Sequence, residues 1–151
     1  MSKPCVVDTM VLRKANAALT KQPHQHRDFS RRLALLSRIQ RSELQVLISE
    51  KLIHEYRQQI EEPRNDFVKS FFELLLDPAK SKPNYHKPWS GKERQAQQDC
   101  RFPPEDVHVL RTAVLTDHPS TIFSEEERML KTDACIHRRF SVHVSDPIKE
   151  P

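Results

Sequence analysis

The chain has a single glycine, Gly91, among its 151 residues. Glycine-rich loops let backbone N–H groups approach a phosphate closely, so the P-loop and dinucleotide-binding folds that depend on such loops are excluded. No apolar run approaches the roughly 20 residues that a membrane-spanning helix needs. The opening residues, MSKPCVV, contain no apolar signal-peptide segment. The sequence therefore predicts a cytoplasmic protein with no membrane partner.

Cysteine is also scarce. Cys5, Cys100 and Cys135 are odd in number and share no C-x-x-C spacing, so we expect reduced, buried thiols. Eight histidines are present, but only His24 and His26 lie close together. None of the spacings typical of zinc ligands occurs, and we expect no zinc site.

Short apolar strands alternate with helical patterns along the chain. The expected strands are Pro4–Asp8, Gln45–Ser49, Ser120–Phe123 and Ser141–Ser145. Apolar residues recur at helical spacing in residues 26–44, 50–60, 65–76 and 105–115. This alternation predicts an α/β protein with a parallel sheet that helices cover on both faces. The length suits a single domain over residues 1–151, without repeats.

Residues 78–104, here called the basic insert, interrupt the alternation. They contain five prolines, the only glycine and the only tryptophan, so we expect a long loop or flap. Residues 79–101 carry six Lys or Arg against two Asp or Glu, which accounts for the whole net charge of +4. Such a segment attracts polyanions, although a solvated loop explains it equally well.

The basic insert also mixes aromatic and basic side chains, as single-strand nucleic-acid binders do. The residues expected to contact a nucleic acid are Lys80, Lys82, Lys87, Trp89, Lys92 and Arg94. Tyr85 and Phe102 are further candidates for base stacking. The alternative is that these aromatic side chains pack the insert onto the domain.

Four acids are expected at the carboxyl ends of the strands, the edge where parallel α/β sheets bind ligands. Asp8 ends the first strand, Glu126 follows the third, and Asp106 opens the helix before the third. Glu55 flanks the buried stripe of the helix after the second strand. Each acid alone is typical of a turn, a helix cap or a solvated edge. Together they would repel one another unless a divalent cation neutralised them, and oxygen ligands favour Mg²⁺ or Mn²⁺.

Five short motifs resemble, in order and spacing, those of the PIN-domain nucleases, and within them the PIN-type toxins of bacterial toxin–antitoxin pairs. The motifs are VVDTMVL, ISEKLIHEY, PEDVHVLRTA, TIFSEEERML and VHVSDPIKE. Met10 departs from the family's Asn, Glu126 departs from its Asp, and the basic insert is longer than expected. The resemblance implies one PIN-like domain, a three-layer α/β/α sandwich with a small parallel sheet in which strand one is central.

The resemblance also implies a Mg²⁺- or Mn²⁺-dependent endoribonuclease. Its catalytic residues and metal ligands would be Asp8, Glu55, Asp106 and Glu126. Thr9 and Ser124 would orient these carboxylates through hydrogen bonds. The implied partners are a single-stranded RNA substrate, a cognate antitoxin protein and a second copy of the chain in a homodimer. Two alternatives stay open: a PIN-like domain with weak or no catalysis that binds RNA or protein, and a nuclease directed at DNA.

Overall fold

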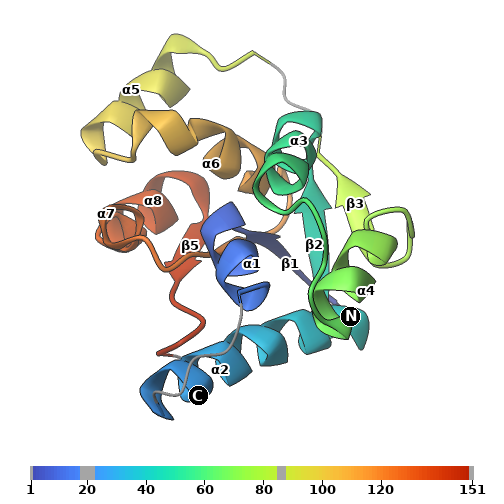
Figure 1. Ribbon diagram of the computed structural model, residues 1–151. Coiled ribbons are helices and arrows are strands. Elements are labelled where there is room, and N and C mark those ends of the chain that lie inside the picture. Colours follow the sequence, from blue (N-terminus) through green and yellow to red (C-terminus); the bar gives the residue numbers. More distant parts are fainter. Residues whose placement is uncertain (1, 18–22, 85–87, 150–151) are drawn as a thin grey trace.

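Five parallel strands form the centre of the protein in a computed structural model, which describes residues 2–17, 23–84 and 88–149 (Figure 1). The strands lie in the order β3-β2-β1-β4-β5, so β1 is central, as expected. Their bounds are β1 Lys3–Val7, β2 Leu44–Ile48, β3 Ser81–Pro83, β4 Ser120–Phe123 and β5 Val142–Ser145. The predicted α/β class with a parallel sheet is confirmed.

Helices join the strands and cover both faces of the sheet. They are α1 Thr9–Ala15, α2 Pro23–Gln40, α3 Glu50–Gln59, α4 Asp66–Leu74, α5 Gly91–Asp99, α6 Val107–Ala113, α7 Glu127–Leu130 and α8 Asp133–Phe140. The helix α2 packs on β2, and α6 packs on β1, β2 and β4. The chain steps from β1 to β2 in one direction and from β3 to β4 in the other. Right-handed crossovers therefore place α2 and α6 on opposite faces, which gives three layers.

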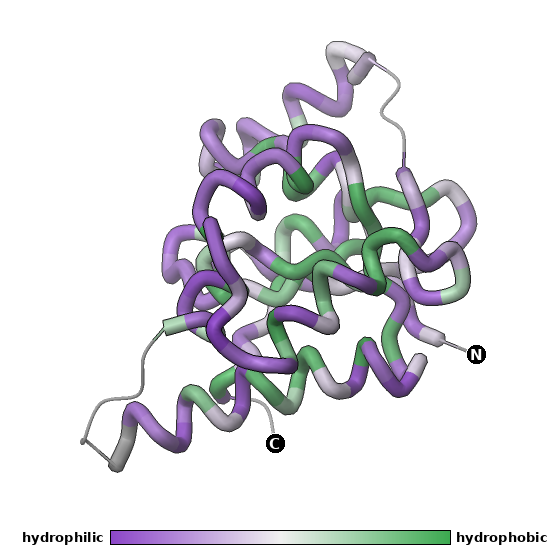
Figure 2. Tube along the Cα trace, turned by 45° about the vertical axis from the view of Figure 1, so that its right-hand side comes forward, coloured by the Kyte–Doolittle hydropathy of each residue, from purple (hydrophilic) through white to green (hydrophobic). Residues whose placement is uncertain are grey.

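The strands are apolar on both faces because helices cover both. Val6, Val46 and Ile122, from three neighbouring strands, are fully buried. Figure 2 shows the hydrophobic stretches gathered inside the fold and the hydrophilic ones along its periphery. No helix among the described residues is long and apolar enough to cross a membrane.

A buried tyrosine fixes α3 beside the end of β1. Tyr56 is fully buried, and its hydroxyl donates a hydrogen bond to the carbonyl of Val7. Ser49 caps the helix by accepting a hydrogen bond from the backbone N–H of Leu52 at 3.4 Å. These contacts hold α3, and with it Glu55, next to the residue that follows β1.

The basic insert contains regular structure, so the prediction of one long loop is wrong. Ser81–Pro83 form β3 at the edge of the sheet, where a proline is tolerated because one side of the strand has no partner. The helix α5 begins with a capping box, in which Ser90 and Glu93 each accept a hydrogen bond from the other's backbone N–H.

The aromatic residues of the insert pack onto the domain where the structure describes them. Phe102 is 1% exposed and belongs to the core, so its candidacy for base stacking is wrong. Trp89 is half-buried and stacks on Phe140, with ring centroids 5.4 Å apart. Tyr85 and Lys87 lie outside the described residues.

Cys100 and Cys135 form a disulfide, so the expectation of reduced thiols is wrong for these two residues. The bond joins the C-terminal end of α5 to α8, where Arg139 and Asp99 also pair at 3.7 Å. Cys5 is a free thiol, and its burial in the sheet raises its pKa to about 12.

The disulfide should stabilise the fold measurably. It spans 35 residues of sequence, and a cross-link over a loop of this length is worth about 2–4 kcal/mol because it restricts the unfolded chain. We expect a reductant to lower the free energy of unfolding by this amount in urea titrations. The Cys100→Ser/Cys135→Ser variant should have the lower value already, and a reductant should not change it. An unchanged wild type under reducing conditions would contradict this prediction.

Candidate metal centre

Three of the four predicted acids sit directly before helices. Asp8, Asp106 and Glu126 are the N-cap residues of α1, α6 and α7. A carboxylate at this position ordinarily accepts a hydrogen bond from the first turn of its own helix. None of the three caps its helix in this way, although the adjacent backbone N–H of Thr9 helps to lower the pKa of Asp8. Their side chains are therefore available to one another and to a ligand.

All four predicted acids line one cavity of about 210 Å³, here called the acid cavity, at the carboxyl edge of the sheet. The backbone N–H of Asp8 donates to the carbonyl of Phe123 at 2.9 Å, which holds the ends of β1 and β4 together. The lining residues are Asp8, Thr9, Met10, Arg13, Glu55, Gln59, Asp106 and Glu126. The structure thus brings together the side chains that the sequence pattern singled out.

Two of these acids, together with Glu105, could hold a metal ion. Glu105, Asp106 and Glu126 each offer a carboxylate oxygen, and the three oxygens lie within 4.8 Å of one another. Carboxylate oxygens are hard ligands of the kind that Mg²⁺ and Mn²⁺ prefer. The sequence argument did not select Glu105, although it directly precedes Asp106.

Burial raises the pKa of the Asp8 carboxyl to about 6. A hydrogen bond that Ser124 Oγ donates to Asp8 Oδ2, at 2.8 Å, opposes this shift, whereas the charges of Glu126 and Glu55 add to it. Ser124 also accepts a hydrogen bond from the backbone N–H of Glu126 at 3.1 Å. It therefore links two of the acids.

The pKa of Asp106 is raised further, to about 7. Partial burial is the largest cause, followed by a hydrogen bond to Glu126 that favours the protonated form of Asp106. The charges of Asp8, Glu126 and Glu105 act in the same direction. Without a cation, the cluster therefore retains protons close to neutral pH.

One hydrogen bond and one close polar contact hold the carboxylate of Glu55. Thr9 Oγ1 donates to Oε1 at 2.6 Å, and His108 Nε2 lies 2.7 Å from Oε2. The sequence argument predicted the donor at Thr9 but missed His108, which is only 5% exposed. A histidine within an apolar helical pattern is typical of a core position. The one sign of a functional role in the sequence was the place of His108 two residues after Asp106.

Two arginine–glutamate pairs frame the acid cavity. Arg32 makes a two-pronged contact with the buried carboxylate of Glu125, at 2.7 and 2.8 Å, and so ties α2 to the segment before α7. Arg128 lies 2.6 Å from Glu105 and 3.8 Å from Glu126. The pKa of Glu105 is lowered, first by its own backbone N–H and then by this arginine.

The basic residues of the insert lie elsewhere. Lys80 Nζ donates to the carbonyl of Gln40 at 2.6 Å, and Lys82 lines a different cavity. Neither these lysines nor Lys92 and Arg94 belong to the described lining of the acid cavity, so their contact with RNA stays a prediction. The basic side chain that does line it is Arg13, one helical turn after Thr9, which the sequence argument missed.

Comparisons of the chain with models of protein families, with curated proteins and with solved structures give no match. A function can be proposed from the four acids, their hydrogen-bond donors and Arg13. These residues define a carboxylate-lined cavity at the edge where open α/β proteins bind ligands.

The metal-free protein should lose stability as the pH rises. Asp8 and Asp106 have pKa values of about 6 and about 7 in the fold, above the ordinary value of 3.8, so the folded protein binds protons that the unfolded chain releases. The stability from this protonation is complete below about pH 4 and is lost as the pH rises through 6 and 7. Bound Mg²⁺ would supply the neutralising charge instead, so its effect on Tm should grow over the same range.

Thermal unfolding in EDTA and in saturating Mg²⁺ checks this expectation. We expect Mg²⁺ to raise Tm more at about pH 8 than at about pH 5. The Asp8→Asn/Asp106→Asn variant is the control. Because it lacks both titrating carboxyls, the effect of Mg²⁺ on its Tm should change little between the two pH values. An effect of Mg²⁺ that is the same at both pH values, or the same in the variant, would count against a metal centre here.

Proposed function

We propose that this protein is a metal-dependent endoribonuclease that resembles the PIN-type toxins and cleaves single-stranded RNA. One observation carries the proposal. Three N-cap carboxylates, at Asp8, Asp106 and Glu126, leave their own helices uncapped and line one cavity with Glu55. The central β1 and the five-motif resemblance support the same proposal.

The residues present fit a hard divalent cation. The three oxygens of Glu105, Asp106 and Glu126 lie close enough to share an ion. Burial first, and the neighbouring carboxylates second, raise the pKa values of Asp8 and Asp106, and a cation would offset both effects. In this proposal Asp8, Glu55, Asp106 and Glu126 hold one or two Mg²⁺ or Mn²⁺ ions, and Glu105 is a further carboxylate close enough to share one. When bound, the cation would lower the pKa of a coordinated water and balance charge on the phosphoryl oxygens.

The protein's own side chains would position the reactants. Thr9 and His108 fix the orientation of Glu55, and each of its oxygens keeps a lone pair for a water or a ligand. Ser124 holds Asp8 in the same way. Arg13 places a guanidinium in the cavity wall, where it would bind a substrate phosphate. These groups act by orientation and charge, which are the main contributions that a protein makes to phosphoryl transfer.

Two further parts of the proposal rest on the resemblance. The carboxylates do not favour RNA over DNA, so this preference comes from the resemblance. The expectation of a cognate antitoxin comes from the resemblance as well, because no feature of the described surface indicates one. Met10, half-buried in the cavity wall, stands where the family has an Asn and offers no amide group. A domain that binds RNA or protein without cleaving it is therefore the outcome against which the proposal is tested.

Replacing one acid should abolish cleavage without unfolding the protein. We expect Asp106→Asn to reduce the cleavage rate of labelled single-stranded RNA at least about 100-fold, since a metal ligand should matter at least as much as the residues that orient one. Its Tm without metal should hold or rise, because one repulsive charge is removed. Glu127→Gln is the matched control: this neighbouring acid is exposed and pairs only with Lys131 among the described residues, at 3.6 Å.

The products and the substrates separate the alternatives. Cleavage should require Mg²⁺ or Mn²⁺, stop in EDTA, leave a 5′-phosphate and be faster on RNA than on DNA of the same sequence. Faster cleavage of DNA would assign a DNA-directed nuclease. Wild-type protein that binds Mn²⁺ but cleaves neither polymer would instead establish a binding module.

A further inference from the structure

A second cavity, of about 720 Å³, lies at the opposite edge of the sheet from the acid cavity. It lies where β1 and β4 begin, and the loop of residues 114–119 between α6 and β4 forms part of its wall. We call it the amino-edge cavity and define it by Lys3, Leu47, Lys82, His118, His137 and His143. Its volume falls in the range of cavities that bind small molecules, about 300–1,000 Å³.

The charge of the amino-edge cavity is of one sign. Lys3 comes from the start of β1 and Lys82 from β3, and the strand register turns the two side chains to opposite faces of the sheet. His143 lies on the same face as Lys3. No Asp or Glu is among the described residues that line it. The acid Asp133 lies 3.4 Å from His143 Nδ1 but outside this lining. An anionic ligand would therefore meet Lys3 without a competing carboxylate in the wall.

The same wall offers a flat aromatic surface and apolar contacts. His137 and His143 stack with ring centroids 3.8 Å apart and an angle of 18° between their planes. A planar heteroaromatic ring can extend such a stack, as bases do on histidine and other aromatic side chains. Leu47 and Leu115 add apolar surface beside it.

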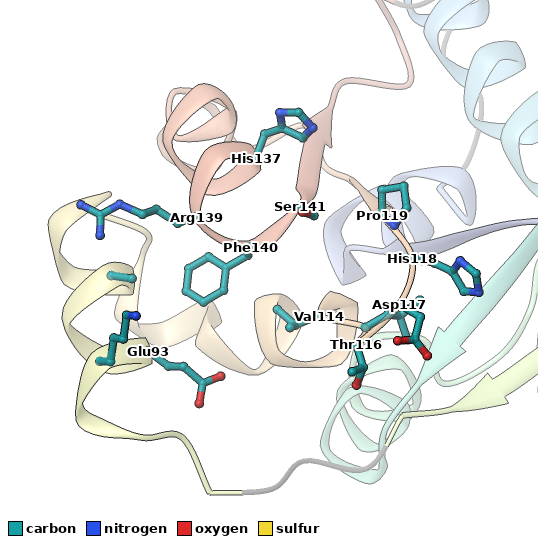
Figure 3. Close-up of a pocket in the computed structure, with 13 residues that line it drawn as sticks. Glu93, Val114, Thr116, Asp117, His118, Pro119, His137, Arg139, Phe140 and Ser141 are labelled. Carbon is teal, nitrogen blue, oxygen red and sulfur yellow. The ribbon is translucent and has the colours of Figure 1, made fainter.

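The neighbouring cavity makes a useful contrast (Figure 3). It lies between α5, α8 and the same loop, with a volume of about 600 Å³. There Glu93 and Asp117 accompany Arg139, so acids and bases are mixed. His118 points from the loop toward the strands, away from Arg139, and lines both cavities. The single-sign lining is thus particular to the amino-edge cavity.

We propose that the amino-edge cavity binds a nucleotide, with its phosphate at Lys3 and its base against the His137–His143 stack. This site is separate from the acid cavity, because the five residue steps from Lys3 to Asp8 along β1 span about 15 Å. It does not rest on the proposed nuclease activity. The ligand is either a free mononucleotide or the 5′-phosphorylated end of an RNA strand, which share this chemistry.

Titration calorimetry in EDTA, which keeps divalent cations out of the acid cavity, tests the proposal. The probes are the four ribonucleoside 5′-monophosphates, with adenosine and ribose 5-phosphate as the corresponding fragments. We expect at least one monophosphate to bind saturably. Adenosine lacks the phosphate and ribose 5-phosphate lacks the base, so each fragment should bind at least about tenfold more weakly. Lys3→Gln should weaken binding at least about tenfold through loss of a charge-assisted hydrogen bond. Lys82→Gln should change the affinity much less, because this side chain lies on the opposite face of the sheet.

Matched variants locate the site. Lys92→Gln removes a lysine that lines the neighbouring cavity only, and it should bind like the wild type. His143→Ala should weaken the monophosphate more than ribose 5-phosphate, because it removes the stack and leaves Lys3. Circular dichroism and Tm confirm that each variant is folded.

The source of the ligand follows from one more comparison. A 5′-phosphorylated RNA trinucleotide that binds more tightly than any mononucleotide identifies an RNA end, and the reverse order identifies a free nucleotide. Absence of saturable binding by all four monophosphates and the trinucleotide would overturn the proposal. Wild-type affinity in Lys3→Gln, or equal binding of inorganic phosphate, would overturn it as well.

Discussion

The burial of neighbouring carboxylates at the carboxyl edge of the sheet is the constraint on which the rest of the site depends. Asp8 is almost fully buried, and its pKa of about 6 and the value of about 7 for Asp106 measure how strongly the fold disfavours their charged forms. A cluster of this kind is stable only with protons or a cation between the oxygens. The fold keeps the acids together despite this cost, which is common at functional sites.

The backbone largely fixes the positions of these side chains. Asp8, Asp106 and Glu126 each fall at the junction before a helix, so the direction of each helix sets where its acid begins. The hydrogen bond from Asp8 N to Phe123 O joins two of the junctions, and Tyr56 holds α3 against Val7. The hydroxyl donors Ser124 and Thr9 then orient the carboxylates, and His108 lies in close contact with Glu55.

Much of this could be predicted because it follows from local pattern. Buried parallel strands are short apolar runs, and the acids stand at fixed offsets from them, so four of the strands and the shared edge of the four acids follow from the sequence. The central place of β1 was expected from the family resemblance and not from this pattern. The strand β3 was not predicted, because it is short and contains Pro83, and proline is unfavourable in most strand positions. The helix α5 buries only Ala96 and has no apolar period, although its Ser90–Glu93 capping box was a signal.

Other features depend on tertiary contacts that have no sequence signature. Cys100 and Cys135 meet only because α5 lies beside α8. His108 meets Glu55 only because α6 and α3 are neighbours. The lysines of the insert were grouped by sequence, yet Lys82 belongs to β3 and Lys92 to α5, so they line different cavities. Charge counted along a chain does not give charge in space.

The most direct test of the metal centre is a crystal soaked in Mn²⁺ and measured at a wavelength where manganese scatters anomalously. The account predicts one or two anomalous peaks within about 2.0–2.3 Å of carboxylate oxygens in the acid cavity, with Asp106 and Glu126 among the ligands. The Asp106→Asn crystal should lose or weaken them. Strong anomalous density elsewhere with none between these carboxylates, at a pH where Asp106 is ionised, would contradict the central claim.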